Sequence, residues 1–172
     1  MRPLILLALL VTAPASAQAL RGHNANAPVD VDADRIEVQD RTDRAIFSGN
    51  VKVRQGGLSL DAARLTVSYS SGAGGGTSIQ RLDASGGVTV RSASETARGN
   101  FAIYDLNRRL ITMIGRVTLN QGANVLRGGR LVIDLNSGRS VIDGSATGGR
   151  DGVSSGPGGR VTGRFTVPQR GN

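Results

Sequence analysis

Apolar and polar residues alternate along most of this chain, in short runs that Gly, Asn, Asp and Ser separate. The runs cover residues 35–38, 46–53, 58–69, 81–90, 101–106, 109–119 and 130–135. Successive side chains of an extended strand point to opposite faces, so this alternation predicts strands with one apolar face. Val, Ile, Thr and Leu dominate the runs, as pleated sheets prefer. No stretch keeps a helical period, and the sequence therefore predicts an all-β domain.

The runs recur with a period of about 29 residues. Gly49, Gly86, Gly115 and Gly144 occupy equivalent positions, spaced 37, 29 and 29 residues apart. A glycine-rich insert at residues 70–78 explains the longer first interval, and we expect it to form a mobile hairpin or loop. A fixed period of this length is typical of one supersecondary unit stacked several times. The sequence thus predicts a repetitive sheet whose ends invite further stacking.

Aligning the repeats shows which side chains share a face. Residues two positions apart lie on the same side of a strand, and several such columns are apolar in most repeats. We assign the following residues to one continuous apolar interior: Ile36, Val38, Phe47, Val51, Val53, Leu65, Val67, Val88, Val90, Tyr104, Met113, Val117, Leu119, Leu131 and Ile133. The pattern alone fits both a closed core and an interior that opens to a ligand.

The two ends of the chain differ from this body. Residues 1–19 are predicted to be a cleavable secretory signal, with Arg2 before an apolar run and a small-x-small site at Ala15 to Ala17. The apolar run is shorter than the roughly 20 residues that a spanning helix needs. We predict a flexible lead-in at residues 20–28 and the folded domain at 29–144.

The C-terminal residues 145–172 are rich in glycine. We expect most of this tail to be disordered. Residues 160–167 resemble the start of a repeat and are expected to form one last, poorly packed strand.

Charge adds a partner class to this picture. The chain has 21 basic and 13 acidic residues, a formal net charge of +8, and Lys52 is its only lysine. Arginine binds phosphate and carboxylate through a planar fork. Aromatic residues make up only 3% and no nucleic-acid-binding motif is present, so nucleic acid is not a predicted partner. For an exported protein we expect anionic lipid or polysaccharide, the alternative being arginines that only keep the protein soluble.

Catalytic chemistry is not predicted. His23 is the only histidine and falls in the lead-in, and there is no cysteine. Asp105, Asp134 and Asp143 recur at repeat turns, where aspartate commonly bonds its own backbone. The alternating acids at residues 30–34 lack the Gly and Glu of a calcium loop. We therefore expect no enzyme, no cofactor and no metal. A β-helix enzyme acting on acidic polysaccharide is a weaker alternative, because Asp105 and Asp134 align but no third acid extends the ladder.

Residues 31–67 resemble the OstA-like domain of the LptA family of lipopolysaccharide-transport proteins. The resemblance rests on an acidic first strand, a Phe and Gly before an apolar strand, a QGG turn at residues 55–57, and a following alternating strand. The matching residues are Asp32, Asp34, Phe47, Gly49, Val51, Val53, Asp61, Ala62, Leu65 and Val67. The repeats extend this resemblance to about Gly144, so that it covers roughly two thirds of the chain.

The resemblance implies a twisted antiparallel β-jellyroll that is open and V-shaped, in a periplasmic protein. Its interior would hold the acyl chains of lipopolysaccharide, and Arg54, Arg91 and Arg116 beside the inward columns are candidates for the head-group phosphates. Protomers or neighbouring domains would join head to tail through edge strands. The bridge would run from the inner-membrane transport complex at the N-terminal edge to the outer-membrane translocon at the C-terminal edge.

Two features depart from the family pattern. The insert lengthens one hairpin, and the glycine-rich last unit weakens the C-terminal edge. Two functions are alternatives to this carrier and bridge. One is a structural β-repeat scaffold with a closed core, and the other is an LptC-like relative that keeps its N-terminal helix as an inner-membrane anchor.

Overall fold

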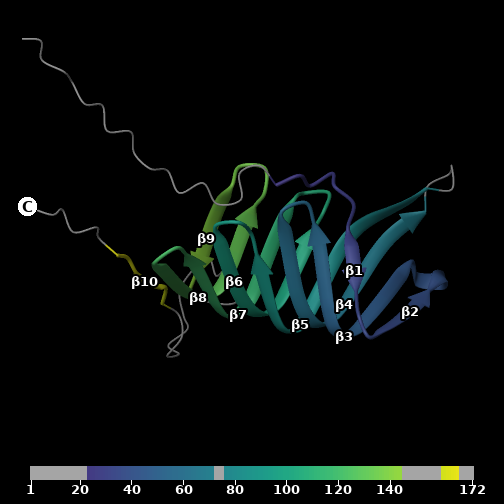
Figure 1. Cartoon of the computed structure of the whole chain (residues 1–172), viewed down its shortest axis with the longest axis horizontal. Coiled ribbons are helices and arrows are strands. Elements are labelled where there is room, and N and C mark those ends of the chain that lie inside the picture. Colours follow the sequence, from purple (N-terminus) through teal and green to yellow (C-terminus); the bar gives the residue numbers. More distant parts are fainter. Residues whose placement is uncertain (1–22, 72–75, 145–159, 167–172) are drawn as a thin grey trace, which may run out of the picture.

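Long antiparallel strands, each hydrogen-bonded to the next in sequence, make up most of the computed structural model, which describes residues 23–71, 76–144 and 160–166 (Figure 1). The elements are β1 (Asp30–Asp32), β2 (Arg35–Gln39), a 3₁₀ turn η1 (Asp40–Thr42), β3 (Arg44–Gln55), β4 (Leu58–Ser71), β5 (Thr77–Arg91), β6 (Glu95–Asp105), β7 (Leu110–Gln121), β8 (Asn124–Asp134), β9 (Arg139–Asp143) and β10 (Thr162–Arg164). The predicted all-β class is confirmed.

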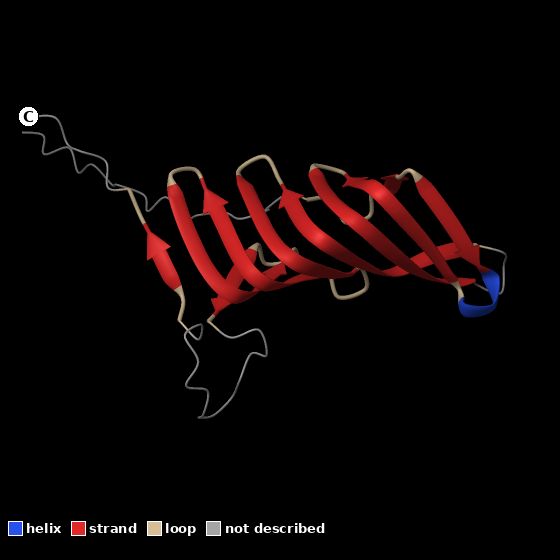
Figure 2. Cartoon of the chain, turned by 90° about the horizontal axis from the view of Figure 1, so that it is seen from below, coloured by secondary structure: helices blue, strands red, loops and turns tan. Residues whose placement is uncertain are grey.

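A β-bulge interrupts each of the strands β3, β5 and β7. At each bulge two residues oppose a single residue of the following strand, at positions 49–50, 86–87 and 115–116. Bulges bend a strand and increase its twist. Because the bulges lie side by side across the sheet, all the long strands bend along one line, and Figure 2 shows their common curvature.

The bulges explain the repeat in the sequence. Gly49, Gly86 and Gly115 open the three bulges and have φ values of 80°, 85° and 82°. Residues with a side chain rarely adopt this conformation. A Cβ on Gly86 would also lie 2.5 Å from the Cβ of Ala63. Each repeat is therefore a pair of bent strands, and its glycine marks the bend.

The bend divides the sheet into two facing layers. Layer A consists of β2, residues 44–48 of β3, 64–71 of β4, 77–85 of β5, 101–105 of β6, 110–114 of β7, 130–134 of β8, and β9. Layer B consists of β1, residues 51–55 of β3, 58–61 of β4, 88–91 of β5, 95–98 of β6, 117–121 of β7, 124–128 of β8, and β10. The layers join at the bulges, whereas the hairpin turns form their free edges. The sheet is not closed into a barrel, as the predicted V-shaped jellyroll requires.

The core lies between the two layers. Every predicted interior residue from Val51 onward in the sequence is buried, and Leu65, Met113 and Leu131 have no exposed surface. Phe47 is half-buried and packs against this core. Burial of apolar side chains stabilises the fold by roughly 25 cal/mol for each Å² removed from water, so this interior is the main source of stability in a chain without disulfides.

Ile36 and Val38 are corrections to the predicted interior. They pair with Phe47 and Ala45 and so lie on the inner face of layer A. Their exposed fractions are nevertheless 56% and 58%. The reason is position, because β2 is the last strand of layer A and, within the described residues, no further strand continues the layer beyond it.

The insert and the tail lie only partly within the described residues. β4 and β5 continue into the insert with Ser70 paired to Ser78 and Ser71 to Thr77, so its ends extend a hairpin rather than a loop. A last short strand is present as β10, paired with β8. The predicted signal peptide and most of the glycine-rich tail lie outside the described residues. Within the described ranges, no helix is long and apolar enough to cross a membrane.

Candidate functional site

The interior between the layers contains two adjoining cavities. One is lined mainly by apolar side chains of both layers together with Gln55 and Tyr104. The other is lined by Leu58, Val90, Ser92, Glu95, Ala97, Leu119 and Ile133. Leu58 and Val90 line both cavities, so the two spaces are neighbours along the interior. They lie close to the free edges of the layers, near the hairpin turns.

The bulges explain why several lining residues were not predicted. On β4, Leu58, Leu60 and Ala62 face inward before the bulge line, whereas Leu65 and Val67 face inward after it. The inward-facing positions of β4 are therefore even-numbered up to Ala62 and odd-numbered from Leu65 onward. A strict alternation of two assigns Leu58 and Leu60 to the wrong face.

A buried hydrogen bond joins the free edges of the two layers. The Tyr104 hydroxyl, on layer A, donates to Gln55 Oε1, at the end of the layer B part of β3, at 2.9 Å. Burial raises the pKa of Tyr104, and the charge of Arg109 lowers it to a smaller extent. The phenol is therefore neutral and serves as a donor at physiological pH. In this conformation the V is closed at that point.

Residues 23–28 cross the same free edges, and we call this segment the strap; Figure 1 shows it in purple along the top of the molecule. Gln55 Nε2 donates to the carbonyl oxygens of Ala25 and Ala27 at 2.9 and 3.1 Å. Arg109, in the turn between β6 and β7, donates to Asn26 Oδ1 at 3.2 Å. The strap therefore contacts both layers. In this conformation these residues of the predicted lead-in are packed against the domain.

His23 belongs to the same cluster. Its Nε2 lies 3.3 Å from Gln55 Oε1, and its Nδ1 is buried without a hydrogen-bond partner among the described residues. Its position indicates that it helps to hold the strap, a role that its place in the predicted lead-in did not suggest. Among the described residues, no carboxylate or nucleophile contacts it as a catalytic imidazole requires.

Polar side chains recur at the inner free edge of layer B. Gln55, Ser92 and Gln121 each follow a bulge glycine by six residues, so the repeat itself places them there. Gln121 donates from Nε2 to Glu95 Oε1, and Glu95 is 8% exposed. Burial raises the pKa of Glu95, which the bond from Gln121 offsets in part. These residues were not among the predicted site residues, although the polar column recurs in the repeat.

The three head-group candidates do not lie together. Arg54 and Arg91 are on the outer face of layer B near its free edge, where both pair with Ser59 from opposite sides. Arg54 forms an ion pair with Asp32 at 3.2 Å, and Arg91 forms one with Asp61. Arg116 instead lies in the bulge of β7, at the bend. Arg54 and Arg91 therefore lie near the free edge of layer B, whereas Arg116 lies on the opposite side, where the layers join.

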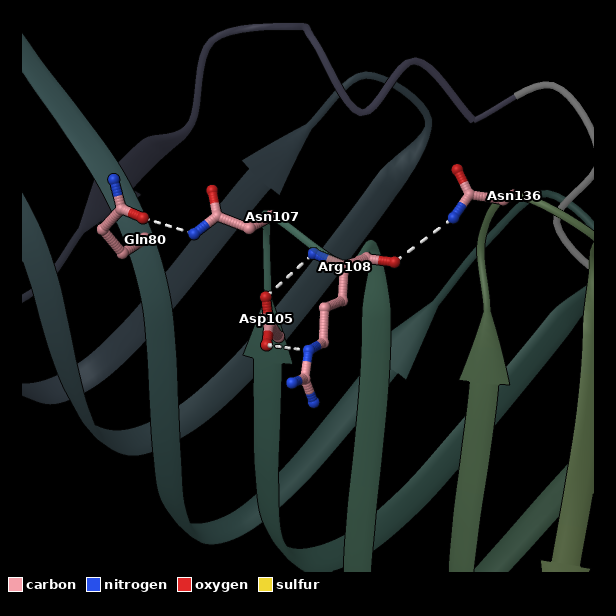
Figure 3. A network of polar contacts seen from close by, with 5 residues as sticks. All are labelled: Gln80, Asp105, Asn107, Arg108 and Asn136. Atoms are coloured by element: carbon pink, nitrogen blue, oxygen red, sulfur yellow. Dashed lines mark hydrogen bonds and ion pairs between the residues drawn. The ribbon is translucent and has the colours of Figure 1, made fainter.

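The repeated aspartates have a structural role at the turns of layer A (Figure 3). Asp105 accepts a hydrogen bond from the backbone N–H of Arg108 at 2.9 Å. Asp134 accepts from the N–H groups of Asn136 and Ser137, and these bonds lower its pKa. These contacts confirm the predicted turn role of both residues. Asp143 differs, because it lies in β9 and pairs with Arg130.

The asparagines of the same turns link neighbouring hairpins. Asn107 donates to Gln80, and Asn136 donates to the carbonyl oxygen of Arg108 at 3.2 Å. Figure 3 shows these contacts, which link β5, the turn between β6 and β7, and the turn between β8 and β9. Among the described residues no group of His, Cys, Asp or Glu is arranged to hold a metal ion. The site is therefore an apolar interior with a polar edge.

Comparisons with known proteins identify a family and similar proteins. Residues 30–139 match the model of the family described as LptA/(LptD N-terminal domain) LPS transport protein. An uncharacterized protein of Rhizobium meliloti (strain 1021), R00383, is 36% identical over 140 residues, which are 78% of this chain and 74% of that protein. The crystal structure of LptH, the LptA homologous periplasmic component of the lipopolysaccharide transport device of Pseudomonas aeruginosa, superposes with a TM-score of 0.71 at 20% identity. The superposition covers 84% of this chain and 99% of LptH.

The match to LptH shows that the fold is shared. The match to the family model covers well over half of the chain and includes all three bulge glycines and both layers. The predicted resemblance is thus confirmed, and this chain belongs to the LptA/LptD N-terminal domain family of lipopolysaccharide-transport proteins.

Proposed function

We propose that this protein is a periplasmic, non-enzymatic carrier that holds the acyl chains of lipopolysaccharide between its two layers. The observation that supports this proposal most directly is the continuous apolar interior of a sheet that is joined on one side only. Each buried CH₂ group of an acyl chain contributes about 0.8 kcal/mol to binding. Arg54 and Arg91 at the outer edge of layer B would meet the phosphates of the head group.

Loading requires the free edges to separate. The interior residues are buried and the two cavities between them are small, so acyl chains need more space than this conformation provides. The bond from Tyr104 to Gln55 and the strap are the contacts that hold the edges together. We propose that both are released when lipid enters, while the bulge line acts as the hinge.

The test is photocrosslinking from two phenylalanine positions that lie on opposite faces of the sheet. Phe47 packs against the interior, whereas Phe101 is 53% exposed on the outer face of layer A. We would replace each in turn with p-benzoyl-phenylalanine, which has a similar shape, and irradiate the purified protein with lipopolysaccharide. Crosslinking from position 47 and not from 101 supports the carrier. Equal crosslinking from both positions, or none from either, contradicts it.

A closed-core scaffold is the second candidate, and the tight burial of Leu65, Met113 and Leu131 favours it. In that case the interior never takes up lipid and the free ends of the layers serve only for assembly. The same experiment separates the two, since a scaffold gives no crosslink from position 47.

We also propose that the protein joins with its neighbours end to end, between an inner-membrane complex and an outer-membrane translocon. Both layers have edge strands at each end of the molecule, which are β1 and β2 at one end and β9 and β10 at the other. Unpaired strand edges favour strand addition by a partner. A head-to-tail contact of this kind continues the apolar interior from one unit into the next.

A further inference from the structure

Glu95 is a buried carboxyl group at the free edge of layer B. It is the first residue of β6, two positions before the inward-facing Ala97, and it is 8% exposed. Its Oε1 accepts the hydrogen bond from Gln121. Its Oε2 has no hydrogen-bond partner among the described residues. A buried acceptor left unsatisfied is costly, so its persistence calls for a role.

The surroundings of Glu95 are those of a ligand site rather than of a polar network. It lines a cavity whose walls are Leu58, Val90, Ala97 and Leu119 of layer B and Ile133 of layer A, with Ser92 as the other polar side chain. The Ser92 hydroxyl accepts from the Glu95 backbone N–H at 3.2 Å and makes no hydrogen bond to Oε2. Within the described residues, no donor of the protein bonds Oε2 in this conformation.

The position along the interior matters as well. Glu95 follows the turn between β5 and β6, so it lies at the free edge of layer B. A lipid held between the layers keeps its head group at this water-facing edge while its chains run inward. The part of the lipid that reaches Glu95 is then the beginning of an acyl chain, next to its linkage.

We propose that Glu95 recognises a hydrogen-bond donor near the head-group end of an acyl chain, either a chain hydroxyl or an amide N–H. Gln121 fixes Oε1 and leaves Oε2 to accept from the ligand. An entirely apolar interior would bind any hydrocarbon chain of suitable length. The Glu95 acceptor instead favours chains that carry a hydrogen-bond donor near the head-group end. This inference rests on the proposed lipid-binding function and adds chemical selectivity to it.

Selectivity can be measured with three glucosyl amphiphiles of equal chain length: a plain ester, a β-hydroxy ester and an amide. Each would compete with a fluorescent acyl probe for the purified protein at neutral pH. One hydrogen bond to a charged acceptor corresponds to roughly tenfold in affinity or more. We expect wild type to bind the β-hydroxy ester, the amide or both about tenfold more tightly than the plain ester.

Glu95→Gln is the deciding variant, because it keeps the shape and the carbonyl that accepts from Gln121 but turns the free oxygen into an N–H donor. We expect it to bind all three amphiphiles with similar affinity. Asp83→Asn makes the same chemical change on the outer face of layer A, where Asp83 pairs with Arg81, and must keep the wild-type preference. Circular dichroism and melting temperature confirm that both variants fold.

The outcomes distinguish this inference from the function on which it rests. If wild type binds all three amphiphiles equally, or if Glu95→Gln keeps the preference, the role of Glu95 is wrong and the carrier function stands. If folded wild type binds none of them, both are wrong. A donor preference shown by the amide alone or by the β-hydroxy ester alone identifies which donor the carboxyl group accepts.

Discussion

Glu95 makes the stability of the fold depend on pH in an unusual direction. Burial raises its pKa above the ordinary value of 4.5, so the folded state holds the proton at pH values where the unfolded chain has lost it. A raised carboxyl pKa contributes stability that is complete below the ordinary value and is lost as pH rises through the folded-state pKa. The other side chains that line its cavity are uncharged and so do not offset this effect.

We therefore predict that Glu95→Gln stabilises the protein at neutral pH and not under acid conditions. The free energy of unfolding should rise by about 1 kcal/mol at neutral pH, since a buried charge is removed. The measurement is urea denaturation of both proteins at a series of pH values from 4 to 8. Parallel curves across that range would show that the carboxyl group keeps the same pKa in the folded and unfolded states.

Individual residues show where sequence patterns are sufficient and where they fail. Inward positions such as Val88 and Leu131 were predictable because two-residue periodicity is set by strand geometry itself. Leu58 was missed because the change of parity at a bulge depends on the neighbouring strand. Ile36 was placed on the correct face but is exposed, because burial depends on what lies opposite and a pattern along one strand carries no such information.

At the scale of the strands, β2 has the most distinctive edge. Its inner face carries Ile36 and Val38, both more than half exposed, at the end of the apolar interior. Exposed apolar edge strands favour pairing with another chain, and natural proteins often block them with lysine. The bulge glycines made the order and spacing of the strands predictable, but not which strands form the ends.

We predict that the double change Ile36→Lys and Val38→Lys prevents end-to-end association. Stability should change by no more than about 0.5 kcal/mol, because exposed positions tolerate substitution. Light scattering coupled to size-exclusion chromatography measures the association over a range of concentrations. Phe101→Lys is the matched control, since Phe101 is similarly exposed at 53% but lies away from the ends, on the outer face of layer A. Association that survives the double change would rule out β2 as the joining edge.

At the scale of the whole molecule, the two layers and the strap form one device for opening and closing. The family resemblance predicted the V shape, whereas the closure was not predictable. It depends on contacts between Gln55, Tyr104 and the strap, which are 28 to 49 residues apart in sequence. A pattern of neighbouring residues does not predict hydrogen bonds between residues so far apart in the sequence. The strap also consists mostly of small and polar residues, as a segment without tertiary contacts commonly does. The contacts between the free edges are thus a tertiary property that a pattern along one strand does not report.

Gln55→Ala should therefore open the molecule more readily. The change removes the contacts of Gln55 with Ala25, Ala27 and His23 of the strap and leaves the buried Tyr104 hydroxyl unpaired, which destabilises the closed form by about 1–3 kcal/mol. We expect faster hydrogen exchange in the strap and faster uptake of a fluorescent acyl probe, measured by mass spectrometry and stopped flow. Gln80→Ala is the control, because Gln80 bonds Ser70 and Asn107 on layer A and does not contact the strap. Faster exchange with an unchanged rate of uptake would mean that the strap covers the opening without controlling entry.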